Sequence, residues 1–319
     1  MVFPFWMGGR RCVFLKVFLT LSFIYCFLSY SACSSHPLSQ QVLSSTSSVL
    51  ETKNLPLLKS NVLTIGSYTN YVPQEYLSAQ GTPTGFDVDL IDDISHHMSV
   101  RPDVVSDDFQ SLIPDLLDGR FDVVISAVSI TPELQQQVDF IPYFRGGQSL
   151  LVRQGNPLHI HVLNDLCGKT VAVRKDSYEQ RALSHASDLC HQDKKSTITL
   201  VLVAQDTDAV HLLQLKQVAA AYEDSSVVDY FINLYPALLA LGGRVIGTTV
   251  EGIILRKNDA AMLTAINLSL QALQDDGTYH ALIVKWGLYR GDITLPANYA
   301  SNNDEDQSLP GKTFLARQR

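Results

Sequence analysis

Short apolar runs alternate with amphipathic stretches of helical period over most of the chain. The clearest run covers residues 121–130, FDVVISAVSI, which is apolar and rich in β-branched residues and so predicts a buried strand. Thr131, Pro132 and Glu133 follow, and they suit the N-cap and first turn of a helix. This order predicts a strand that leads into a helix N-terminus. The unpaired N–H groups of such a terminus either hold an anion or bind only water and their own caps.

Similar patterns predict the remaining elements. Strands are expected at residues 62–66, 104–105, 149–152, 170–173, 198–203, 218–222 and 252–256. Helices are expected at residues 90–98, 109–117, 178–189, 209–215, 225–234, 260–273 and 279–286. Strands that alternate with helices indicate mostly parallel sheets covered by helices. Two such series, joined through Gly-containing segments such as Gly146-Gly147, predict two lobes with a ligand cleft between them.

The N-terminal stretch predicts export from the cytoplasm. Arg10, Arg11 and Lys16 precede an apolar segment, residues 17–30, which is too short for a comfortable membrane span. Small residues then precede Cys33, so residues 1–32 are predicted to be a signal peptide. The Cys resembles the diacylated Cys of bacterial lipoproteins, although Tyr30 stands where that motif prefers Leu. Lipidation of Cys33 is the favoured interpretation, and simple cleavage or an uncleaved anchor are the alternatives.

The composition of the two ends, the net charge and the cysteines add further predictions. Ser-rich residues 33–61 predict a flexible tether, and polar residues 292–319 a disordered tail. The net charge of −8 lacks the basic stripe that nucleic-acid binding needs. Once the signal peptide and Cys33 are set aside, Cys167 and Cys190 remain, either as a disulfide or as two free thiols.

The sequence predicts no metal site, no cofactor and no enzyme. His159 and His161 share one face of a strand, but no third ligand is spaced to join them, and His96 and His97 diverge on a helix. No nucleophile elbow or phosphate-binding loop is present. Glu223-Asp224 is not expected to act as an acid pair, because neighbours on a strand point in opposite directions.

Three motifs in order resemble those of the bacterial extracellular solute-binding proteins of family 3, the polar amino-acid receptors of ABC importers. They are GFDVDL at residues 85–90, FDVVIS with SITPE and VDF-PY between residues 121 and 143, and DGTY with KWG between residues 276 and 287. The resemblance covers roughly residues 62–289. It implies a two-lobed α/β clamp of the type II periplasmic-binding-protein kind, each lobe a mostly parallel sheet flanked by helices. The first lobe is expected at residues 62–142 and 252–291, the second at 148–248, and the hinges at about 143–147 and 249–251.

The resemblance also implies a ligand site. Aromatic walls are expected from Tyr68, Tyr71 and Phe109, and the head group of an amino acid is expected to contact Ser126, Ser129 and the N–H of Thr131. The second lobe is expected to contribute Arg174, Ser177 and Tyr178. Asp224 matches the carboxylate that pairs with the α-ammonium group of the ligand. Charge-assisted bonds of this kind are strong in a cleft that excludes water.

Two departures from the family pattern matter for the ligand. Leu134 stands where the family places an Arg that clamps the ligand carboxylate, and Tyr68 replaces an acid found in binders of basic amino acids. Both changes predict a more aromatic and less charged cleft. Three explanations remain open: Arg174 takes the carboxylate, the ligand lacks a free α-carboxylate, or the cleft has lost amino-acid binding.

The favoured interpretation is a monomeric, non-enzymatic binding protein, periplasmic and held at the membrane as a lipoprotein. It would capture a polar or aromatic amino-acid-like solute by closing its lobes and deliver that solute to a permease in the inner membrane. Two alternatives come from other classes. One is an enzyme of the same fold, a cyclohexadienyl-type dehydratase, and the other is a relic that docks a partner without ligand.

Overall fold

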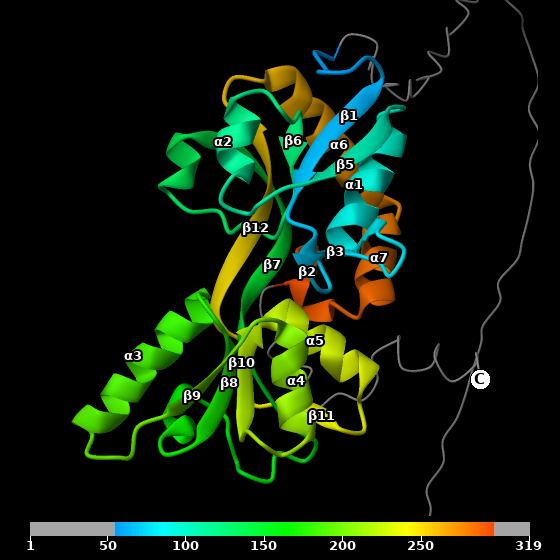
Figure 1. Cartoon of the computed structure of the whole chain (residues 1–319). Helices are drawn as coiled ribbons and strands as arrows, with labels where there is room; N and C mark the ends of the chain where they lie inside the picture. Colours follow the sequence, from blue (N-terminus) through cyan, green and yellow to red (C-terminus); the bar gives the residue numbers. More distant parts are fainter. Residues whose placement is uncertain (1–54, 297–319) are drawn as a thin grey trace, which may run out of the picture. The chain divides into compact units, whose positions relative to one another are not determined.

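The computed structural model describes residues 55–296, whose elements are labelled in Figure 1. The predicted signal peptide (1–32), Cys33 with most of the tether, and residues 297–319 of the predicted tail lie outside the described residues. Among the described residues, no helix combines the length and the apolar character needed to cross a membrane.

The first lobe is built on three parallel strands. β1 (Val62–Ser67) lies between β5 (Arg101–Ser106) and β6 (Val123–Val124). Its helices are α1 (Phe86–His97), α2 (Leu112–Leu117), α6 (Ala260–Asp275) and α7 (Thr278–Trp286). Leu63 and Ile65 of β1 are buried in one cluster with α1, α6 and α7, whereas Val124 belongs to a second cluster with α2. Helices therefore cover both faces of this part of the sheet.

The loop after β1 forms a small separate sheet. Its antiparallel strands are β2 (Asn70–Tyr71), β3 (Glu75–Leu77) and β4 (Pro83–Thr84). The sequence predicted only a loop here. This small sheet carries Tyr71 and Glu75 beside the carboxyl end of β1.

The second lobe repeats the αβ arrangement. β8 (Thr170–Arg174) pairs in parallel with β9 (Thr199–Val203) and with β10 (Ala220–Asp224). Its helices are α3 (Tyr178–Gln192), α4 (Asp206–Gln214) and α5 (Ser225–Leu234). Alternate residues of β8 enter different cores, Val171 and Val173 beside α3 and Ala172 beside α4 and α5, as the two-residue period of a strand requires. Cys167 and Cys190 form a disulfide that fastens the segment before β8 to α3.

Two long strands connect the lobes. β7 (Val138–Arg153) and β12 (Ile246–Arg256) pair antiparallel, and Figure 1 shows both running from the α1–α2 elements to the α3–α5 elements. The strand order is β5-β1-β6-β12-β7-β10-β8-β9, with β11 (Leu239–Leu241) paired to β7. The two-lobed α/β fold is confirmed. The sheet is mixed, because β7 and β12 run antiparallel to their neighbours.

The glycines expected to form a flexible crossing lie inside β7. Gly146 is paired with Thr249 of β12, so the strand continues through both predicted hinge segments. A Cβ atom at Gly146 would lie only 2.4 Å from Oε1 of Glu251. Gly146 is therefore required for the close approach of the Glu251 side chain.

The helix predicted to begin at Thr131 is not formed. The Thr131 hydroxyl accepts a hydrogen bond from the Leu134 N–H at 3.3 Å, as an N-cap would, but only a 3₁₀ turn, Leu134–Gln136, follows. Val138 then enters β7 and pairs with Arg256 of β12. Pairing with β12 thus ends the helical segment after one turn, and the turn is too short to have the dipole of a helix N-terminus.

Residues 55–61, assigned to the tether from the sequence, pack against the first lobe. Leu55 and Leu57 contact its core, and the Leu58 N–H donates to Oδ1 of Asp122 at 2.9 Å. The tether boundary predicted from the Ser-rich composition was therefore too late in the chain.

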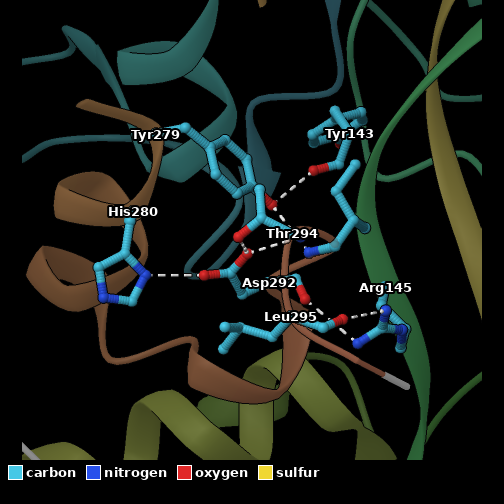
Figure 2. A network of polar contacts seen from close by, with 8 residues as sticks. Tyr143, Arg145, Tyr279, His280, Asp292, Thr294 and Leu295 are labelled. Atoms are coloured by element: carbon cyan, nitrogen blue, oxygen red, sulfur yellow. Dashed lines mark hydrogen bonds and ion pairs between the residues drawn. The ribbon is translucent and has the colours of Figure 1, made fainter. Parts of the chain in front are cut away.

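The C-terminal segment, residues 288–296, is likewise ordered where a disordered tail was predicted from residue 292 (Figure 2). Asp292 is fully buried, accepts from the Thr294 N–H at 2.8 Å, and lies 2.7 Å from Nδ1 of His280. Arg145, in the middle of β7, donates to the carbonyl oxygens of Asp292 and Leu295. Arg290 forms an ion pair with Asp229 of α5, so this segment contacts the second lobe as well as the first.

Candidate functional site

A cleft of about 760 Å³ lies between the lobes, and residues of both line it. Its volume falls within the usual range for small-molecule sites. The first lobe contributes residues from the β1–β2 loop, from β2 and β3, from the segment before α2 and from the turn after β6. The second lobe contributes the loop after β8, the first turns of α3 and α4, and the carboxyl end of β10. The carboxyl ends of parallel strands therefore face the cleft, which is where α/β sheets bind ligands.

Aromatic side chains of the first lobe line one side of the cleft. The Tyr68 and Phe109 rings meet edge to face, with centroids 6.1 Å apart. Phe109 is 44% exposed and Tyr178, across the cleft, is 59% exposed. Large rings left open beside a cavity can stack on a ligand or face a cation.

Polar side chains of the first lobe are already engaged with one another. The Ser126 hydroxyl accepts from the Tyr68 N–H at 3.0 Å and donates to Oε1 of Glu75 at 2.7 Å. The Ser129 hydroxyl donates to Oγ1 of Thr249 at 3.4 Å. Ser126 thus orients the Glu75 carboxyl toward the cleft that both residues line.

A hydrogen bond joins the two lobes across the cleft. The Tyr71 hydroxyl donates to Oδ2 of Asp224, the last residue of β10. The Arg174 guanidinium lies 5.7 Å above the Tyr71 ring, and its Nη1 lies 3.4 Å from Oδ2 of Asp206. Arg174 is therefore held between an aromatic face and a carboxylate.

Ser177 serves as the N-cap of α3. Its hydroxyl accepts from the Gln180 N–H at 3.0 Å and donates to the Arg174 carbonyl at 2.8 Å. Both functions of the hydroxyl are occupied, so Ser177 orients the helix beside the cleft.

Carboxyl groups outnumber cations among the lining residues that the structure describes. Three Lys or Arg side chains line the cleft, all from the second lobe: Arg174, Lys175 and Arg181. The eight acids come from both lobes: Glu75, Asp108, Asp176, Glu179, Asp206, Glu223, Asp224 and Glu251. The prediction of a cleft less charged than is usual for the family stays a prediction, but the lining itself is rich in acids.

Burial and mutual repulsion raise the pKa values of the buried acids in this set. Burial, and then the charge of Glu179, raises the pKa of Asp224 to about 8. Burial raises the pKa of Glu75 and of Glu251 well above the usual range, and Asp87 adds to both shifts. Burial together with Asp206 does the same for the pKa of Glu223. In the absence of a counter-charge, several of these groups hold protons near neutral pH.

Nine of the ten predicted ligand residues line the cleft, and Thr131 does not. The nine are Tyr68, Tyr71, Phe109, Ser126, Ser129, Arg174, Ser177, Tyr178 and Asp224. Their contact with a ligand stays a prediction. Thr131 caps its own 3₁₀ turn instead. Leu134 is not among the lining residues either, because its side chain packs against the apolar cluster under α2.

Sequence analysis missed the buried acids. Glu251 fell in a predicted hinge just before the expected strand at residues 252–256, and Glu75 was a charge between aromatic and turn residues. Glu223 was set aside because its strand neighbour Asp224 was expected to point the other way, yet both line the cleft. The chain leaves β10 at Asp224 and enters α5, so the two-residue alternation ends there.

Comparisons with known proteins agree with this architecture. The family model described as bacterial extracellular solute-binding proteins, family 3, matches residues 63–289. The lysine/arginine/ornithine-binding periplasmic protein of Escherichia coli K12 is 32% identical over 70% of this chain and 86% of its own length. A putative ABC transporter arginine-binding protein 2 of the same strain is 27% identical over 73% of this chain and 93% of its own. The solved structure of an ancestral cationic amino-acid solute-binding protein has a TM-score of 0.65 at 27% identity, covering 71% of this chain and 96% of that one.

Proposed function

Because this chain belongs to the bacterial extracellular solute-binding proteins of family 3, we propose that it captures a small amino-acid-like solute in the interlobe cleft for an ABC importer. The observation that carries the proposal is the position of Asp224, which lies at the end of β10 and lines the cleft. A carboxylate in such a place pairs with a protonated amino group through a charge-assisted bond.

Contacts from both lobes support capture by closure. Tyr71 of the first lobe and Asp224 of the second already meet across the cleft. A ligand amino group at Asp224 would take a place beside the Tyr71 hydroxyl and so contact both lobes. A ligand that makes its full set of contacts only when both lobes surround it favours the closed arrangement.

The delivery step follows from the relatives. The named relatives are binding proteins of ABC transporters or of the periplasm. We infer that the loaded protein docks on a membrane permease and acts outside the cytoplasm, held there through Cys33. It works as a monomer and catalyses no reaction. The solute was expected to be polar or aromatic, and the acids of the cleft favour one with a protonated nitrogen.

A thermal-shift panel of amino acids and amines tests this proposal. A ligand at about a hundredfold its Kd should stabilise the protein by about 2.7 kcal/mol. Asp224→Ala should weaken binding by about 2–5 kcal/mol, because it removes a buried partner of a charged group. Asp139→Ala is the matched control, since Asp139 pairs with Lys257 on the surface. A panel in which nothing stabilises the protein, or equal binding by Asp224→Ala, would refute the proposal.

A further inference from the structure

The described lining of the first lobe offers no cation to a ligand carboxylate. Of the lining residues that the structure describes, those from the first lobe include no Lys or Arg. Leu134 turns its side chain into the apolar cluster under α2 and gives the cleft no donor. A carboxylate could find a cation only on the second lobe.

Of the three second-lobe cations in the described lining, Arg174 is already paired with an acid, and Lys175 and Arg181 are exposed. Arg174 lies over the Tyr71 ring with its Nη1 at 3.4 Å from Asp206. The Arg181 guanidinium lies 6.0 Å from the Tyr178 ring centroid. A carboxylate that approached Arg174 would lie beside Asp206, and that repulsion would cancel much of the attraction.

Two buried carboxyl groups that line the cleft each interact with a neighbouring acid, Glu75 with Asp87 and Glu223 with Asp206, and each has an oxygen without an N–H or hydroxyl donor. Oε2 of Glu75 and Oε1 of Glu223 accept no hydrogen bond from an N–H or hydroxyl group of any described residue, although their side chains are 1% and 2% exposed. A buried acceptor without a donor costs free energy. Glu75 belongs to the first lobe and Glu223 to the second, so a ligand with N–H donors at both ends could satisfy both.

The aromatic rings are suited to the same chemistry. Tyr68, Phe109 and Tyr178 surround the cleft, and the Tyr71 ring already has a guanidinium above it. Aromatic faces attract ammonium and guanidinium groups, most strongly where water is excluded. Acids and open rings together describe a site for positive charge.

We propose that the ligand is an organic cation, an amine or guanidine with no free carboxylate. This inference rests on the proposed function and narrows the class of solute. The protonated nitrogen groups pair with Asp224 and with the carboxyl groups of Glu75 and Glu223. The carbon chain lies between the aromatic rings. Removing the carboxylate removes the group for which the described lining of the first lobe holds no cation and for which Arg174 is already paired with Asp206.

Matched ligand pairs test the proposal by isothermal titration calorimetry on the purified full-length chain. Arginine with agmatine, lysine with cadaverine, and ornithine with putrescine each differ only by a carboxylate. We expect the decarboxylated member of at least one pair to bind about tenfold tighter or better, because a repelled, unpaired carboxylate is costly to bury. Argininamide, which keeps the bulk but not the charge, should bind as agmatine does. If every amino acid that binds does so as tightly as its amine, the proposal is overturned.

Two variants identify the residues responsible. Asp206→Asn releases Arg174 from its ion pair, so the preference for agmatine over arginine should shrink by about tenfold. Glu75→Gln should weaken agmatine binding by about tenfold or more, whereas the surface control Asp139→Asn should leave it unchanged. An unaltered preference in Asp206→Asn together with unaltered agmatine binding in Glu75→Gln would overturn the proposal.

The outcomes also separate this inference from the broader one. Tight binding of arginine or lysine with weak binding of their amines would overturn only the missing carboxylate and leave an amino-acid receptor. Failure of both members of every pair, with no other amino acid bound, would overturn both.

Discussion

The Tyr71 hydroxyl donates a hydrogen bond to the Asp224 carboxyl, so a residue of the first lobe contacts the candidate ligand residue of the second. Burial, together with the charge of Asp224, raises the pKa of the Tyr71 hydroxyl well above its usual value. Tyr71 therefore remains a donor throughout the physiological pH range. Its bond stabilises the ionised form of Asp224, whereas burial and Glu179 favour the protonated form.

This balance predicts that ligand affinity depends on pH. Asp224 has a pKa of about 8 in the free protein, and a bound cation lowers that pKa because it favours the carboxylate. Binding then releases a proton, so affinity should rise as the pH increases up to about 8 and level off above it. The charges of Glu179 and Asp206 also raise the pKa of Asp224, whereas that of Arg174 lowers it. If the bound cation reaches Glu179 and Asp206, these two groups release protons as well.

Calorimetry of agmatine binding in buffers of different ionisation enthalpy counts the released protons. Tyr71→Phe keeps the ring but loses the hydroxyl, so the pKa of Asp224 rises and the levelling-off point should move to higher pH. Affinity that does not change between about pH 6 and about pH 8 would contradict the assignment of Asp224.

The unliganded protein should lose stability as the pH rises from about 4 to about 8, and part of this loss falls above neutrality. The pKa of Asp224 is raised to about 8 and that of Asp87 to about 7, far above the value of about 3.9 for an unfolded Asp. The folded state then binds more protons than the unfolded state, so the free energy of unfolding falls with pH until both groups are ionised. Urea unfolding at about pH 7 and about pH 9 measures the fall, which should be smaller in Asp224→Asn. An equal fall in that variant would count against the raised pKa.

The C-terminal segment should contribute to stability. Asp292 is fully buried and contacts both His280 and Thr294, so Asp292→Ala leaves their donors without a partner. We expect the free energy of unfolding to fall by about 1–3 kcal/mol. The exposed pair of Asp139 with Lys257 is the comparison, because Asp139→Ala should cost less than about 1 kcal/mol. Equal losses in urea unfolding would show that the segment is not fastened as described.

The disulfide should stabilise the second lobe. Cys167 and Cys190 are 23 residues apart, and closing a loop of that size in the unfolded chain is worth about 3 kcal/mol. Replacement of both by Ala should lower the melting temperature, and a reducing agent should lower that of the natural protein by a similar amount. The double variant should not respond to the reductant. No difference between oxidised and reduced natural protein would contradict this expectation.

Sequence patterns predicted the helices and strands whose apolar residues recur with the period of a helix or a strand. The alternation of Val171 and Val173 with Ala172 belongs to such a strand, and so do the buried positions of α1. Elements that depend on distant partners were missed. The first half of β12 is polar and becomes a strand because it pairs with β7, and the same pairing ends the turn after Thr131.

The sequence predicted the position of the site better than it predicted the charge of the site. Motif positions brought Asp224, Tyr71 and Arg174 to the cleft that the structure contains. The charge of the cleft could not be predicted, because Glu75 and Glu251 reach it through loop geometry and through the gap left by Gly146. Burial then raises the pKa values of these acids, which no local pattern encodes.

Native mass spectrometry of the protein purified from its own cells tests the central claim most directly. The account predicts a complex with a small molecule that carries a protonatable nitrogen and no carboxylate, and loss of that complex in Asp224→Ala. The same small molecule bound equally by Asp224→Ala, or a natural protein that carries a compound with a free carboxylate, would contradict it.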